Sequence, residues 1–120
     1  MALNTYAQVQ QFITEVLKTN NEWSDVPNSP HKAFWELPYN DFVNGNVPNV
    51  LDPKTRQPMP ILVKGNSIQS NIILALQGAK GTVFDPDTGD FGRMPANGPP
   101  FFTPEQIKEI ADWIDKGCPE

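Results

Sequence analysis

The residues best suited to chemistry are few, and they lie far apart in the chain. There is one histidine, His31, and one cysteine, Cys118, which stands close to the C-terminus. A Cys–His nucleophile is therefore not expected, because the base must reach the thiol. The sequence also lacks a phosphate-binding loop and the Cys/His spacing of a zinc site. We therefore expect no enzymatic activity.

A second candidate is the acidic stretch Asp85-Pro86-Asp87-Thr88-Gly89-Asp90, whose first carboxylates are spaced two apart as in a calcium loop. The order of such a loop is not followed, because Gly89 stands where a third oxygen ligand belongs. Ala96 occupies the position of the bidentate glutamate. The pattern instead favours an Asp/Gly turn, and no metal site is predicted.

Charge and composition disfavour several classes of partner. The formal net charge is -5 and the sequence pI is about 4.7, which argues against nucleic acids and anionic membranes. No apolar run is long enough to span a bilayer. The first residues lack the basic-then-apolar order of a secretory signal. We expect a cytoplasmic protein as the sequence is written, or a periplasmic one if a signal peptide has been removed.

The clearest structural element is a helix that begins after Thr103 and ends before Gly117. Thr103 can cap it, Pro104 suits its first position, and Gln106 completes a capping box. Isoleucines recur at i, i+3 and i+7, which is the period of one buried helix face. Gly117 is suited to end the helix in a left-handed conformation.

A second amphipathic helix is predicted near the N-terminus, capped by Asn4 or Thr5 and running to about Lys18. Its apolar face comprises Tyr6, Val9, Phe12, Ile13, Val16 and Leu17. We expect this face to pack against the C-terminal helix, which brings the two ends of the chain together.

The chain between these helices is predicted to form short helices and long loops, because it is rich in proline and glycine. The whole sequence holds 13 prolines and 8 glycines. Two short helices are expected at about 31–36 and 38–44. Residues 45–66 carry four of the prolines. We expect this stretch to be an extended loop anchored to the core rather than part of a sheet.

One further helix is predicted before a second long loop. Ser67 or Ser70 should cap it, and it should reach about Gln77, with Ile68 among its mostly buried apolar residues. Residues 79–102 should then form a loop, and loops of this length in small domains are usually functional. The sequence therefore predicts a mostly α fold in a single domain over all 120 residues.

Four pieces of sequence in fixed order point to a known family. They are Thr5-Tyr6-Ala7-Gln8-Val9-Gln10, a histidine beyond the first helix, Gly92-Arg93-Met94-Pro95, and Trp113-Ile114-Asp115-Lys116-Gly117-Cys118-Pro119. Together they resemble small class I cytochrome c domains of the bacterial type that ends in a Trp-Ile-x-x-Gly helix. The resemblance implies crossed N- and C-terminal helices and loops wrapped around a haem. It also implies attachment through Cys-x-x-Cys-His, with that His and a later Met as axial ligands.

The chain departs from this family where haem would be attached. The positions that match Cys-x-x-Cys-His read Pro27-Asn28-Ser29-Pro30-His31. Covalent haem is excluded, because thioether bonds need thiols and Cys118 matches no attachment position. The axial positions implied by the resemblance, His31 and Met94, are both present. Each also has a plainer interpretation, as a loop histidine and as a methionine that fills an irregular gap. Two ligands are too few to argue for copper.

Loss of the haem leaves a volume that other groups must fill, because protein interiors do not tolerate large voids. We expect bulky aromatic side chains to occupy it, and the alternative is a smaller pocket that they line. The candidates are Phe34, Trp35, Tyr39, Phe42, Phe84, Phe91, Phe101 and Phe102.

Three hypotheses for function follow. The first is a haem-free binding or interaction module that uses the aromatic stretches 34–42 and 84–102, with a protein or a small apolar ligand as partner. The second is an electron carrier that holds haem non-covalently through His31 and Met94. The third is a small-ligand carrier or enzyme accessory subunit that uses the vacated cavity. The missing thiols favour the first, which needs no cofactor.

Overall fold

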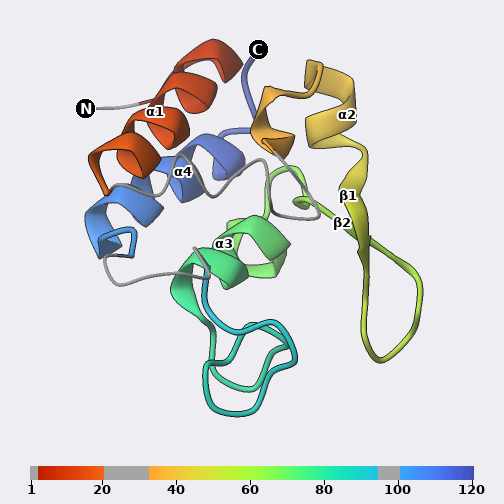
Figure 1. Ribbon diagram of the computed structural model, residues 1–120. Coiled ribbons are helices and arrows are strands. Elements are labelled where there is room, and N and C mark those ends of the chain that lie inside the picture. The colour runs from red at the N-terminus through yellow and green to blue at the C-terminus, as the bar shows by residue number, and fades with distance from the viewer. Residues whose placement is uncertain (1–2, 21–32, 95–100) are drawn as a thin grey trace.

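The structure, a computed structural model, describes residues 3–20, 33–94 and 101–120. These residues are 44% helix and 9% strand, so the expected mostly α class is confirmed. Figure 1 shows α1 and α4 together, with a two-stranded ribbon and the loop after α3 projecting away from them. In chain order the elements are α1 (Tyr6–Thr19), η2 (Phe34–Glu36), α2 (Tyr39–Val43), β1 (Asn46–Leu51), β2 (Pro58–Pro60), η3 (Ser67–Gln69), α3 (Asn71–Gln77) and α4 (Pro104–Asp115).

The C-terminal helix α4 forms as its sequence predicts. The Thr103 hydroxyl accepts a hydrogen bond from the Gln106 N–H at 3.1 Å, and the Gln106 side chain accepts one from the Thr103 N–H at 2.8 Å. This reciprocal capping satisfies two donors that helix geometry leaves unpaired. After the helix, Gly117 has a φ of 95°, so its left-handed conformation is confirmed.

The N-terminal helix α1 also begins and ends close to its predicted limits. Thr5 caps it by accepting a hydrogen bond from the Gln8 N–H at 3.2 Å. The predicted apolar face is buried except for Phe12, which is half-buried. Asn20 follows the last turn and bonds back to the Val16 carbonyl at 2.9 Å. The 3.6-residue period of the sequence therefore identified this helix and its inward face.

The two terminal helices contact each other, which the sequence predicted. The rings of Tyr6 on α1 and Trp113 on α4 stack with centroids 6.2 Å apart. The Tyr6 N–H bonds to the Glu120 carbonyl at 3.3 Å. This hydrogen bond places the start of α1 beside the C-terminal residue.

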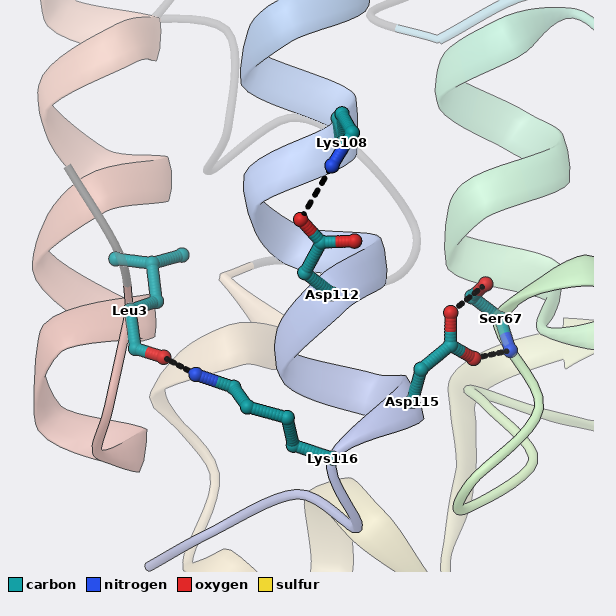
Figure 2. Close-up of polar contacts among 6 residues, drawn as sticks. All are labelled: Leu3, Ser67, Lys108, Asp112, Asp115 and Lys116. Carbon is teal, nitrogen blue, oxygen red and sulfur yellow. Dashed lines mark hydrogen bonds and ion pairs between the residues drawn. The ribbon is translucent and has the colours of Figure 1, made fainter.

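Two polar side chains tie the C-terminal end of α4 to its neighbours on both sides (Figure 2). Lys116 donates from Nζ to the Leu3 carbonyl at 2.9 Å. Asp115 accepts hydrogen bonds from the N–H and the hydroxyl of Ser67, each at 2.8 Å. One helix end therefore links the N-terminal segment to η3.

The expectation that residues 45–66 hold no sheet is wrong, because β1 and β2 pair as an antiparallel ribbon. The register joins Asn46 to Pro60 and Leu51 to Pro58, with an irregularity between them. Asn49 lies inside β1 with a φ of 59°. In a two-stranded ribbon each strand has a free edge, so prolines are tolerated there although they cannot donate to a partner.

The middle helices lie where they were expected, with one correction. Helices η2 and α2 fall within the predicted 31–36 and 38–44, and residues 31–32 lie outside the described part of the chain. The predicted helix before Gln77 is divided, because Ser70 is extended and separates η3 from α3. Ile68 is consequently off the buried face of α3 and is 81% exposed, so its predicted burial is wrong.

The core lies where α1, α3 and α4 meet the segment that holds η2 and α2. Its largest fully buried side chains include Trp113, Phe42 and Phe102. Met59 and Phe84 are buried outside this core, in the ribbon and in the loop after α3. Among the described residues, no helix is both long enough and apolar enough to cross a membrane.

Candidate functional site

Four of the eight predicted aromatic residues gather with one ring from each terminal helix. We call this set the aromatic core cluster. Tyr6 and Phe42 have centroids 5.1 Å apart, and Tyr6 meets Tyr39 edge-on at 5.7 Å. Phe42 also stacks with Phe34 at 6.2 Å and lies 6.3 Å from Trp113. These separations are those of favourable aromatic pairs. The members of the cluster are Tyr6, Phe34, Trp35, Tyr39, Phe42 and Trp113.

The aromatic core cluster is interior rather than surface. Trp113 and Phe42 are fully buried, and Trp35 is 3% exposed. Phe34 and Tyr39 are half-buried. Because Trp35 and Phe42 are buried, the stretch 34–42 cannot present these two rings to a partner. Its rings fill space between the terminal helices instead.

The Tyr6 hydroxyl is the polar centre of the cluster. It donates to the carbonyl of Trp35 at 2.8 Å and also contacts the carbonyl of Leu37. Burial raises the pKa of the Tyr6 phenol to about 12, and the negative charge of Asp41 adds to the rise against an opposing hydrogen bond from Gln10. The phenol therefore acts as a neutral hydrogen-bond donor that joins α1 to the η2–α2 segment.

The remaining polar atoms of the cluster also bond within the protein. Trp35 donates from Nε1 to the Thr14 hydroxyl at 3.0 Å, and Trp113 donates to the Pro119 carbonyl at 3.0 Å. The Tyr39 hydroxyl donates to the carbonyl of Cys118. Cys118 itself is fully buried, and its burial raises the pKa of the thiol. The cluster is therefore satisfied internally, which suits a structural core better than a ligand site.

The other four predicted aromatic residues do not join this cluster as one site. Phe84 and Phe91 pair with centroids 5.9 Å apart in the loop after α3. Phe101 lies under the guanidinium of Arg93, 4.4 Å from its carbon atom to the ring centroid. Phe102 is 2% exposed and belongs to the main core. The eight residues thus occupy at least three different environments.

Of the two residues that match haem ligands, the structure describes only Met94. It is half-buried, and its backbone N–H bonds to the Ala75 carbonyl near the end of α3 at 2.9 Å. His31 lies outside the described residues, as do Pro27 and Pro30, which the resemblance matches to the haem-attachment cysteines. Within the described chain, no group of three or more His, Cys, Asp or Glu residues could hold a metal ion.

The acidic stretch 85–90 forms a turn organised by Asp85, whose carboxylate is buried. Its oxygens accept the N–H groups of Gly81 at 2.9 Å and Asp87 at 2.8 Å. These two bonds lower the pKa of the Asp85 carboxyl. Gly89 is required here, because a Cβ on it would lie 2.3 Å from the Val83 carbonyl oxygen. The Asp85 oxygens are thus used to hold the loop.

Arg93 is the residue whose role the sequence did not reveal. Its Nε–H donates to the carbonyl of Leu76 at 3.0 Å, and its Nη2 donates to that of Phe102 at 3.4 Å. Its aliphatic part crosses Gly78, where a Cβ would come within 2.8 Å of the arginine Cβ. A cation is favoured at the C-terminal end of a helix, and this was the only feature of the sequence that suggested a partner for the end of α3. Arg93 reaches that end from a loop that lies well beyond α3 in the chain.

Two of the hollows on the described surface are lined by none of the eight aromatic candidates. One of about 180 Å³ lies between Lys54 of the hairpin loop and residues 81–83 and 88–90. The other is a groove of about 440 Å³ between the end of α3 and the first turns of α4. Its lining residues are Gln77, Arg93, Pro104, Ile107, Lys108 and Ala111.

Comparison with known proteins finds no matching family model, no similar curated protein and no similar solved structure. The cytochrome c resemblance therefore depends on the residues quoted from the sequence.

Proposed function

We propose that this chain is a haem-free binding module with a cytochrome c-like fold, in which aromatic side chains fill the centre that haem occupies in that family. The observation that supports the haem-free centre is the aromatic core cluster. Tyr6 stacks on Trp113 and Phe42 lies against both, with Trp113 and Phe42 fully buried. The contact between α1 and α4 and the half-buried Met94 after α3 support the same fold.

Packing physics favours the absence of haem. A tightly packed interior cannot admit a porphyrin without moving the rings that fill it, and such rearrangements of a core cost free energy. The former cysteine positions are Pro27 and Pro30, so no thioether bond would offset that cost. A non-covalent haem would be held only by its axial ligands and by packing contacts around the porphyrin.

The second candidate function is electron transfer by a haem held between His31 and Met94. One observation favours it, namely that Met94 is half-buried and that its backbone is fixed to Ala75 by a 2.9 Å hydrogen bond. A thioether so placed is partly accessible to a ligand. Ligation by His and Met would raise the reduction potential, as in cytochromes c.

Titration of the purified protein with hemin separates the two functions. We expect only weak, non-saturating absorbance changes, and we expect His31→Ala to leave the melting temperature nearly unchanged. A sharp Soret band with low-spin features at one hemin per chain would overturn the proposal. Loss of those features in both His31→Ala and Met94→Ala would then establish the axial pair. Met59→Ala is the control, because Met59 is buried in the β ribbon and should not affect the spectrum.

A further inference from the structure

The groove between α3 and α4 combines an apolar wall with positive charge. Ile107 and Ala111 lie one turn apart on α4 and form part of that wall, with Pro104 at the start of the helix. Arg93 and Lys108 contribute the two cations among the lining residues. The groove volume of about 440 Å³ falls within the range of small-molecule sites.

The two cations differ in how fully they are already paired. Lys108 is exposed and bonds to Asp112 at 2.7 Å, the pair drawn in Figure 2. Arg93 is half-buried, and its two hydrogen bonds go to backbone carbonyls. No carboxylate of the described residues pairs with it. A guanidinium has five N–H donors, so donors remain for a further acceptor.

The position of Arg93 is fixed before any ligand arrives. The Leu76 and Phe102 carbonyls hold the guanidinium, and the Phe101 ring lies 4.4 Å below it. A cation that is already oriented loses little conformational entropy on binding. Carboxylates are the natural partners of such a fork, because hydrogen bonds between charged groups are about twice as strong as neutral ones.

We propose that this groove binds a small molecule with one carboxylate and a short apolar tail. The carboxylate would lie on Arg93, and the tail would cover Ile107 and Ala111. The inference rests on the proposed function in one respect, since it names the ligand class of the haem-free module. It uses described residues only and does not involve His31.

The test is an NMR titration of the folded, hemin-free protein with octanoate, observing backbone amides and the Nε–H of Arg93. We expect saturable shifts of Arg93 and of residues 107–111, with a dissociation constant in the millimolar range or below. Octan-1-ol has the same tail without the charge, and it should bind about tenfold more weakly. Equal binding of both compounds would contradict a role for Arg93.

Two variants locate the site. Ala111→Trp fills the groove from the half-buried face of α4 and should abolish the octanoate shifts while leaving the melting temperature within a few degrees. Arg93→Lys keeps the charge without the fork and should weaken octanoate about tenfold. Lys54→Gln is the control, because Lys54 borders the other hollow and its loss should change nothing.

The outcomes distinguish this inference from the proposed function. If hemin fails to bind and octanoate gives no saturable shifts, the ligand class is wrong and the haem-free module stands. If octanoate binds the Ala111→Trp variant as tightly as the original chain, the groove is not its site. If hemin binds with a low-spin spectrum, the proposed function fails whatever octanoate does.

Discussion

Tyr6 joins several parts of the molecule. Its ring stacks on Trp113 of α4, and its backbone N–H bonds to Glu120. Its hydroxyl bonds to the carbonyl of Trp35 within η2 and to that of Leu37 just after η2. A buried carbonyl that loses its hydrogen-bond donor is left unpaired, and nothing then offsets the free energy of its desolvation. The phenol hydroxyl should therefore contribute to stability beyond what the burial of its apolar ring contributes.

Tyr6→Phe should therefore reduce the free energy of unfolding by about 1–2 kcal/mol, measured by urea denaturation. The folded pKa of about 12 lies above the unfolded value of 10.0, so the neutral phenol stabilises the protein fully below pH 10. That stability should be lost as pH rises from 10 towards 12, because the unfolded chain ionises first. Tyr6→Phe should lack this alkaline loss. An unchanged alkaline profile in the variant would contradict the assignment.

Tyr39→Phe is the matched comparison for Tyr6. The Tyr39 hydroxyl donates to one carbonyl, that of Cys118, and the residue is half-buried. Removing it should destabilise the protein less than Tyr6→Phe does. A larger effect at Tyr39 would show that the tail contact, rather than the η2 contact, holds the terminal helices in place.

Asp85 gives a second prediction at the residue scale, with the opposite dependence on pH. Its folded pKa is lowered by the Gly81 and Asp87 N–H groups, so its carboxylate stabilises the fold above the unfolded pKa of 3.8. This stability should disappear as pH falls below 3.8 through the lower folded value. Asp85→Asn should lower the melting temperature at neutral pH and weaken the loss of stability as pH falls below 3.8. Asp87→Asn, at an exposed position, should do neither.

At the scale of elements, the end of α4 acts through Asp115. Its carboxylate accepts both the N–H and the hydroxyl of Ser67, and so fixes η3 to the helix (Figure 2). Asp115→Ala should cost about 1 kcal/mol of unfolding free energy and increase hydrogen exchange in η3. Asp112→Ala on the same helix removes an exposed pair with Lys108 and should change stability little. If both variants lose the same unfolding free energy, the hydrogen bonds from Asp115 to Ser67 do not stabilise the attachment of η3 to α4.

The β ribbon shows how an element can form against its sequence pattern. Asp52 closes the turn, with its carboxylate accepting the Lys54 N–H at 2.8 Å and its own N–H bonding to Gln57 at 2.8 Å. Three of the four prolines that predicted a loop, Pro48, Pro58 and Pro60, lie in strands with free edges, where a missing donor costs little. The hydrogen bonds of Asp52 therefore favour the turn between the strands, and the number of prolines does not exclude the strands themselves.

At the scale of the whole molecule, the helical frame was predictable and the candidate site was predictable only in part. The caps at Thr5 and Thr103 and the apolar periods of α1 and α4 act through neighbours in sequence, so their helices could be located directly. Trp35 and Phe42, predicted as space-filling residues, are buried. The sequence could not show that Tyr6 and Trp113 complete their cluster, because those contacts join distant segments.

The hemin titration tests the whole molecule, because the aromatic core cluster is formed by segments that are distant in the chain. Whether a porphyrin fits depends on how every ring of the aromatic core cluster packs at once, and not on any single ligand. The formal charge of -5 likewise predicts repulsion from polyanions, and it says nothing about the groove that Arg93 and Lys108 line.

The sequence by itself determined the two terminal helices, their caps, their inward faces and the absence of a Cys-x-x-Cys-His motif. Each of these follows from local rules or from the identity of single residues. The tertiary structure alone decided the pairing of β1 with β2, the exposure of Ile68 and the clamp that places Arg93 over Phe101. Those features depend on contacts between residues far apart in the chain, which no local pattern encodes.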